Sequence, residues 1–177
     1  MTDLHRIDAL AMSPTAFLYE GHAHGEPLVD ASLFVTTSPP GRGPGLHVHP
    51  YPELFLREAG VEVTASDNRA WHKQVDYPDW VVNEEARESL RRRSPEVVLC
   101  SWPPAGNAFE RHVFRTPSVQ LYVVIGSRHR FASGDWRAYD EQTAFDREER
   151  PDLARLVVPP ELESAVLVFR RRPGGSG

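Results

Sequence analysis

Short apolar segments alternate with polar, helix-like segments from about residue 61 onward, and this alternation limits the possible folds most strongly. "EVVLCSW" (96–102) and "VQLYVVIGS" (119–127) are nearly continuous apolar runs, which are typical of strands buried on both faces. "VEVTASD" (61–67) and "SAVLVFRRR" (164–172) are the other expected strands. Strands that alternate with helices favour an α/β sheet with helices packed on its faces.

The expected helices lie between these strands. "NEEARESLRRR" (83–93) starts at Asn83, a favourable N-cap residue, and carries acidic residues in its first turn. "NAFERHVF" (107–114) is expected to be helical, and "DEQTAFDREERPDLARL" (140–156) to form a polar helical stretch. We therefore expect a Rossmann-like, three-layer α/β body over about residues 61–172.

The first 60 residues are instead rich in β-strand and turn signals. The clearest are two expected strands and a loop: "TAFLYEG" (15–21), "ASLFVTTS" (31–38) and "PPGRGPG" (39–45). The expected organisation therefore has three parts: a β-rich segment (1–60), the α/β body (61–172) and a disordered tail (173–177).

Composition excludes several classes of protein. A hydrophobic fraction of 40% and a charged fraction of 25% are ordinary for a globular chain, and the net charge of −5 argues against a general nucleic-acid binder. No secretory signal and no apolar run of roughly 20 residues is present, so we expect a cytoplasmic protein without a membrane partner. Cys100 is the single cysteine, which excludes an internal disulfide and a cysteine-rich zinc site. Lys73 is the single lysine, which indicates a GC-rich bacterial coding sequence.

One candidate site lies in "GRGPGLHVHPYPELFLREAG" (41–60). His47 and His49 would lie on the same face of a strand, because side chains alternate with a period of two. Glu53 follows four residues later. Two imidazoles and one carboxylate leave coordination positions open, which suits iron-dependent oxygen chemistry or Lewis-acid catalysis.

The spacing of this stretch resembles the first motif of the cupin family, G-x5-H-x-H-x3,4-E-x6-G. The matching residues are Gly41, His47, His49, Glu53 and Gly60. The resemblance covers about residues 15–60 and implies a divalent metal (Fe, Mn, Ni or Zn) that acts on a small molecule.

The second cupin motif, G-x5-P-x-G-x2-H-x3-N, is incomplete in this chain. Pro104 and Gly106 are followed by His112 six residues after the glycine instead of three, and the closing Asn is missing. The resemblance makes His112 the candidate fourth ligand. It also gives an alternative fold, a single cupin β-barrel with helical insertions.

The same stretch also fits a nucleotide-cofactor site. A strand, a loop with Gly41, Gly43 and Gly45, a helix, and a second strand ending at Asp67 follow in the order of an adenosine-binding unit. Asp67 lies 22 residues after Gly45, close to the expected offset of about 20 residues to the ribose-binding acid. The prolines within the loop remove amide donors that such a cofactor would use.

Residues 61–172 resemble the class I S-adenosylmethionine-dependent methyltransferases. Asp67 would close the second strand of that fold, and "VVLCSWPPAGN" is similar to its fourth-strand region, which often ends in a polar residue followed by Pro-Pro. "VQLYVVIGSRHRF" is similar to its fifth strand. The resemblance implies S-adenosylmethionine as the cofactor.

Three functional hypotheses follow from the sequence, and whether the chain is an enzyme is left open. The first is a cupin-type divalent-metal-binding protein that acts as a small-molecule metalloenzyme. The alternative is a methyltransferase-like domain, active or inactive. The third is a non-catalytic fold that binds neither metal nor cofactor. We expect a small-molecule ligand and leave a homodimer open.

Overall fold

The computed structural model describes residues 31–34, 63–69, 79–157 and 163–174. These residues form one seven-stranded sheet in the order β3-β2-β1-β4-β5-β7-β6. Its strands are β1 (Ala31–Phe34), β2 (Val63–Asp67), β3 (Val82–Asn83), β4 (Val97–Ser101), β5 (Leu121–Ser127), β6 (Phe145–Glu149) and β7 (Ser164–Arg171).

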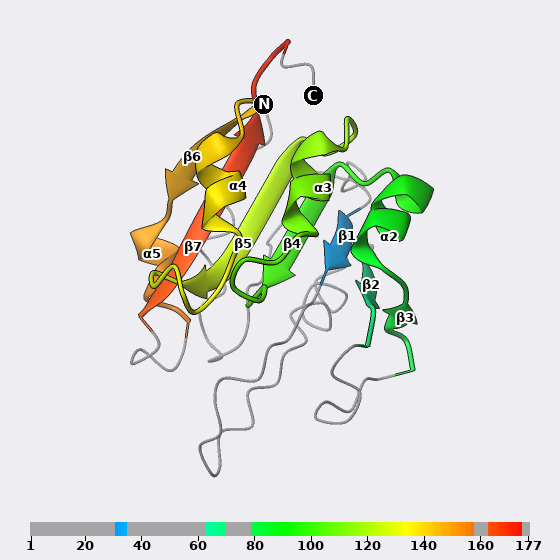
Figure 1. Cartoon of the computed structure of the whole chain (residues 1–177), viewed down its shortest axis with the longest axis horizontal. Helices are drawn as coiled ribbons and strands as arrows, with labels where there is room; N and C mark the ends of the chain where they lie inside the picture. Colours follow the sequence, from blue (N-terminus) through cyan, green and yellow to red (C-terminus); the bar gives the residue numbers. More distant parts are fainter. Residues whose placement is uncertain (1–30, 35–62, 70–78, 158–162, 175–177) are drawn as a thin grey trace, which may run out of the picture.

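The sheet is mixed and open. β1 to β5 run parallel to one another, whereas β7 lies between β5 and β6 and is antiparallel to both. Figure 1 shows β4 and β5 pointing toward the lower edge and β7 pointing upward. The expected α/β architecture is confirmed at this level, and the described strands close no barrel. Apart from residues 31–34, the cupin-like segment of the expected fold (residues 1–60) lies outside the described ranges.

Residues 31–34 lie in the middle of this sheet. β1 pairs with β2 on one side and β4 on the other, with Phe34 opposite Ser66 and Cys100. We expected the α/β body to start at residue 61, but the sheet already contains a strand from the preceding segment. The rest of residues 1–60 lies outside the described residues.

Helices cover both faces of the sheet. They are α2 (Ala86–Arg93), α3 (Glu110–Arg115), α4 (Trp136–Glu141) and α5 (Pro151–Ala154). α2, α3 and α4 cover the face turned to the viewer in Figure 1.

The core is divided between these two faces. On the α2–α4 side, Leu90, Val113 and Tyr139 pack with Tyr122 and Phe169 of the sheet. On the other face, α5 packs on alternate residues of the same strands, among them Ile125, Val166 and Val168. Alternation along each strand therefore produces the three layers.

Two local expectations were wrong in detail. The expected polar helical stretch 140–156 contains β6, whose residue Asp146 pairs with Arg170 of β7. β6 is an edge strand with mostly exposed charged side chains, so its sequence lacks the apolar alternation of a buried strand. The helix expected from Asn83 starts at Ala86, because Asn83 lies in β3 and Glu85 occupies the N-cap. No described helix is long and apolar enough to cross a membrane.

Candidate functional site

The carboxyl ends of the parallel strands meet at one edge of the sheet. The strand order changes direction beside β1, with β2 and β3 on one side and β4 and β5 on the other. Open α/β sheets bind ligands at such a reversal, outside the carboxyl ends of the strands. We call this region the switch-point edge; the strands that end there include β2 at Asp67, β4 at Ser101 and β5 at Ser127.

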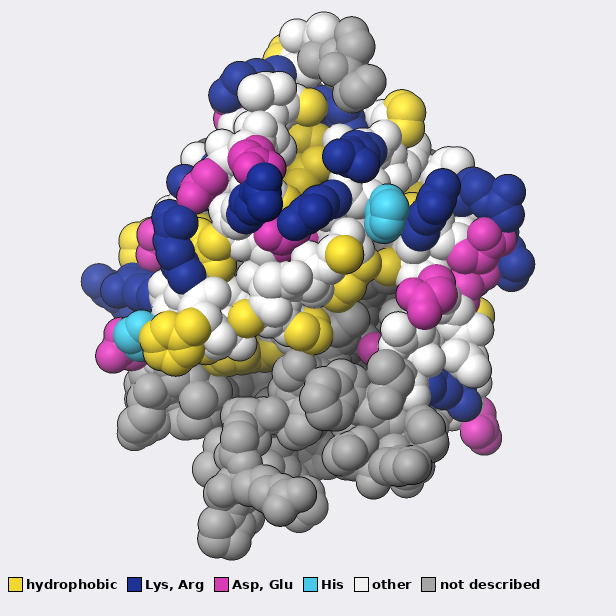
Figure 2. Space-filling view, viewed as in Figure 1, with side chains coloured by type: hydrophobic (Ala, Val, Ile, Leu, Met, Phe, Trp, Pro, Cys, Tyr) yellow, Lys and Arg dark blue, Asp and Glu magenta, His cyan; other side chains and the backbone are white. Residues whose placement is uncertain are grey.

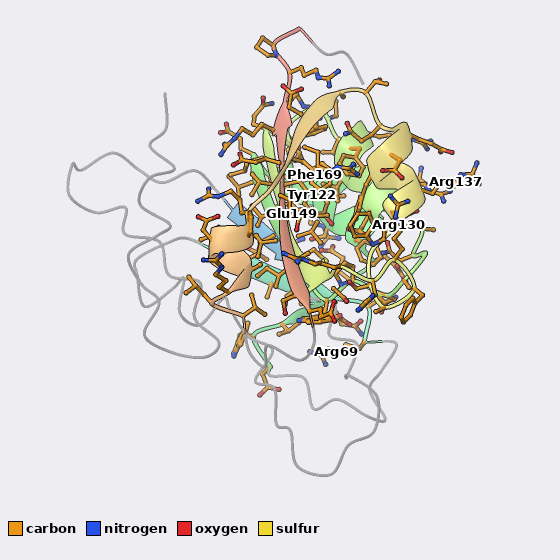
Figure 3. The ribbon with its side chains drawn as sticks, turned by 90° about the vertical axis from the view of Figure 1, so that its left-hand side faces the viewer. Arg69, Tyr122, Arg130, Arg137, Glu149 and Phe169 are labelled. Atoms are coloured by element: carbon orange, nitrogen blue, oxygen red, sulfur yellow. The ribbon has the colours of Figure 1, made fainter. Side chains whose placement is uncertain are left out.

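Asp67 closes β2 at this edge, as the sequence predicted, and only 5% of its surface is exposed. One carboxylate oxygen accepts a hydrogen bond from the backbone N–H of Arg69 at 2.6 Å. Arg69 adopts a left-handed conformation with φ of 52°, and its guanidinium donates to the carbonyl of Val81 at 2.8 Å. Figure 3 shows Arg69 at the lower edge of the sheet. The turn after β2 therefore fixes the Asp67 carboxylate.

Hydrogen bonds also attach α2 to the end of β2. The backbone N–H of Glu84 donates to the Asp67 carbonyl at 3.0 Å, and the Ser66 hydroxyl donates to Ser89 of α2 at 3.0 Å. Arg93 donates to Ser89 at 2.7 Å and is paired with the buried Glu84 carboxylate. These hydrogen bonds fix the end of β2, and therefore Asp67, relative to α2.

The loop after β4, which we call the β4–α3 loop (residues 102–109), lies at the same edge. Trp102 has φ of 53°, and its N–H donates to the carbonyl of Ile125 in β5 at 2.6 Å. The carbonyl of Pro103 accepts from the N–H of Gly134 at 2.9 Å, and Gly106 donates back to the Gly134 carbonyl at 3.0 Å. This loop is therefore hydrogen-bonded to the β5–α4 loop (residues 128–135).

Glu110, at the start of α3, has 0% of its surface exposed. Its carboxylate accepts hydrogen bonds from both loops. The hydroxyls of Tyr122 and Tyr139 both donate to one carboxylate oxygen, the second at 2.5 Å. The other oxygen accepts from the Asn107 side chain at 2.6 Å and from the N–H of Asp135 at 2.7 Å. Sequence reasoning did not identify Glu110, although Asn107-x-x-Glu110 has the spacing of a helix capping box.

The surroundings of Glu110 act on its proton affinity in opposite directions. Burial raises the pKa of its carboxyl above the ordinary value, because the charged form loses its hydration. The hydrogen bonds from Tyr122, Tyr139, Asn107 and Asp135 lower that pKa, but burial dominates. Burial and the Glu110 charge raise the pKa of both tyrosine hydroxyls.

His112, the expected fourth metal ligand, lies on α3 in basic surroundings. Burial and the guanidiniums of Arg87 and Arg115 lower the pKa of its imidazole. The same two positive charges oppose the binding of a metal cation there. Figure 2 shows that the face over α2 and α3 carries both acidic and basic side chains.

The remaining metal and cofactor-loop residues are not described. His47, His49 and Glu53, the three cupin-motif ligands, lie outside the described residues, as do Gly41, Gly43 and Gly45. Within the described ranges, no group of three or more His, Cys, Asp or Glu side chains is arranged to hold a metal ion. The metal site and the glycine loop therefore stay predictions.

Comparison with known proteins gives a distant structural likeness. No family model matches the sequence, and no curated protein matches it. Among solved structures, the crystal structure of the 23S rRNA methyltransferase ErmE is similar over 100% of this chain and 71% of that chain. The TM-score is 0.44 and the sequence identity is 17%.

Proposed function

We propose that this chain is a methyltransferase-like domain that binds S-adenosylmethionine at the switch-point edge. The observation that carries the proposal is the buried Asp67 carboxylate at the carboxyl end of β2, directly beside β1, where the strand order reverses. In adenosine-binding α/β units an acidic residue in this region accepts hydrogen bonds from the ribose hydroxyls.

The chemistry of Asp67 fits a ribose. A carboxylate has about four lone-pair positions, so it accepts ribose hydroxyls in addition to the N–H of Arg69. Because the turn after β2 already holds the carboxylate, little side-chain entropy is lost when the ribose binds.

The sheet as a whole supports the same proposal. The resemblance of residues 61–172 to the class I methyltransferases implies a Rossmann-like sheet. The parallel strands β3, β2, β1, β4 and β5 form a doubly wound sheet of that kind, with its strand order reversing beside β1.

We propose that the β4–α3 loop holds the substrate that accepts the methyl group. Ser101 ends β4, and Trp102, Pro103 and Pro104 follow it, two strand positions from Asp67 across β1. Bound at this edge, S-adenosylmethionine would supply an electrophilic methyl group to an acceptor held by this loop.

The proposal is tested by titration calorimetry with S-adenosylmethionine and S-adenosylhomocysteine. We expect one binding site in the unmodified chain and at least about tenfold weaker binding in Asp67→Asn, because hydrogen bonds to a charged acceptor are worth roughly 1.5–3 kcal/mol. Asn retains an oxygen for the Arg69 N–H, so the turn is expected to keep its conformation.

Asp146→Asn is the matched control, since Asp146 is an exposed acid of β6 that pairs with Arg172. It is expected to bind like the unmodified chain. Absence of binding in the unmodified chain would reject the proposal, and equal affinity in Asp67→Asn would reject the role of Asp67.

A further inference from the structure

We propose that Glu110 is a positioning residue that holds the β4–α3 loop in place at the switch-point edge. The inference rests on the proposed function in one respect: it treats this loop as the acceptor side of a methyltransferase-like site. Glu110 itself is fully buried, so it would act on a ligand through the loops that it holds.

The two carboxylate oxygens of Glu110 face different parts of the fold. One oxygen accepts from Tyr122 of β5 and Tyr139 of α4, which belong to the hydrophobic core. The other accepts from Asn107 and from the N–H of Asp135, which belong to the two loops. The carboxylate therefore connects the core to both loops. Figure 3 shows Tyr122 near Phe169 in the interior, above the level of Arg69.

The connection extends from Glu110 to the prolines that follow β4. The Asn107 amide donates to the carbonyl of Pro104 at 2.8 Å as well as to Glu110, and its oxygen accepts from the Glu110 N–H at 3.1 Å. Pro103 is held in turn by the N–H of Gly134 at 2.9 Å. Removing the Asn107 side chain therefore releases the loop from the carboxylate without changing the carboxylate.

The contact between the loops and the core is close. Gly134 has φ of 80°, and a Cβ at this position would lie 2.6 Å from the Tyr139 hydroxyl that donates to Glu110. On the outer side, Arg111 donates to the Asp135 carboxylate at 2.9 Å. The β5–α4 loop is thus held by contacts on both of its sides. The β4–α3 loop is in turn held to it by the backbone hydrogen bonds of Gly134.

Burying a carboxylate costs hydration free energy, and apolar residues of similar volume often stabilise a core equally well. A fully satisfied polar network instead specifies one arrangement of the groups that it connects. The groups specified here are two loops at the edge where the proposed ligand binds, which is why we assign a positioning role to Glu110.

Amide hydrogen exchange of the full chain, measured together with S-adenosylhomocysteine affinity, tests this inference. In Asn107→Ala we expect exchange at Gly106 and Gly134 to accelerate by about tenfold or more, the equivalent of one lost hydrogen bond. Exchange in β5 and the affinity for S-adenosylhomocysteine are expected to change by less than about twofold.

Three further variants separate positioning from general stability. Tyr139→Phe removes a donor on the core side only, so the two loop amides are expected to keep their protection relative to β5. Glu110→Gln is expected to preserve loop protection, because its amide oxygen can face the loop donors while its NH₂ donates to the tyrosines; Glu110→Ala is expected to lose it.

Unchanged exchange at Gly106 and Gly134 in Asn107→Ala would overturn the inference, as would equal acceleration in Tyr139→Phe. Failure of the unmodified chain to bind S-adenosylhomocysteine would reject the proposed function instead. The exchange rates would still decide whether Glu110 positions the loops, so the two failures are distinguishable.

Discussion

At the scale of single residues, two buried carboxylates with different surroundings account for the candidate site. Asp67 ends β2, as the local pattern "VEVTASD" predicted, and the N–H of the neighbouring Arg69 donates to its carboxylate. Glu110 receives hydrogen bonds from Tyr122, Asp135 and Tyr139, which lie 12, 25 and 29 residues away in sequence. No local pattern contains these partners, and the role of Glu110 therefore emerged only from the folded structure.

Glu110→Ala is expected to lower the free energy of unfolding by about 3 kcal/mol or more, because it leaves several buried donors without an acceptor. Urea unfolding measures this change. The control is Glu141→Ala, which removes an exposed acid paired with Arg137 and is expected to change stability by less than about 1 kcal/mol. Similar losses in both variants would contradict the network.

The raised pKa of Glu110 predicts a pH dependence with a definite sign. Its folded-state pKa lies above the unfolded value, so between the two values the folded chain binds more protons, and stability falls as pH rises. We expect the stability of the unmodified chain relative to Glu110→Gln to be highest near or below pH 4.5, the ordinary carboxyl value, and to decline above it. Unfolding free energies across this pH range measure it, and a relative stability that rises with pH would contradict it.

At the scale of elements, the apolar strands and the charged helix α2 were predictable, whereas the charged strand β6 was not. β4, β5 and β7 lie within one or two residues of the ranges expected from their apolar runs. β6 was expected to be helical, because its sequence "FDREE" has one buried apolar residue and four exposed charged ones. Its strand conformation depends on pairing with β7, a tertiary contact that outweighs local propensity.

Substituting a glycine by alanine is expected to destabilise the two loops of the site to different extents. Gly134→Ala introduces both a left-handed alanine and a collision at 2.6 Å with the Tyr139 hydroxyl, whereas Gly106→Ala, with φ of 65°, meets nothing within 4 Å. We expect Gly106→Ala to cost about 1 kcal/mol and Gly134→Ala to cost about 1–3 kcal/mol more. Thermal unfolding of both variants checks this, and equal midpoints would show that the contact is not tight.

At the scale of the whole molecule, the doubly wound sheet brings together residues that are distant in sequence. Strand and helix alternation predicted the α/β class, and the nucleotide-cofactor interpretation treated "SLFVTTS" (32–38) as the first strand of a unit whose second strand ends at Asp67. The parallel pairing of residues 31–34 with β2 agrees with that interpretation, whereas their pairing with β4 was not predicted. A match to the first cupin motif favoured a separate β-rich segment up to residue 60. Strand pairing is a long-range property, so the local motif carried no information about the neighbours of this strand.

The metal hypothesis yields a prediction of its own. If the cupin-motif residues bind a divalent cation, Mn²⁺ or Zn²⁺ raises the unfolding midpoint of the unmodified chain by mass action, and His47→Ala removes the effect. His112→Ala is expected to retain it, because Arg87 and Arg115 make that position unfavourable for a cation. No shift in the unmodified chain would reject the hypothesis, and loss of the shift in His112→Ala would restore His112 as a ligand.

The central claim is that an adenosine cofactor binds where the strand order reverses, and a hydrogen-exchange footprint with S-adenosylhomocysteine tests it most directly. We expect the ligand to slow exchange at residues 67–69, at the carboxyl end of β2, and to leave β6 (Phe145–Glu149), at the far edge of the sheet, unchanged. No protection at residues 67–69 with saturating ligand, or protection confined to β6, would contradict the claim.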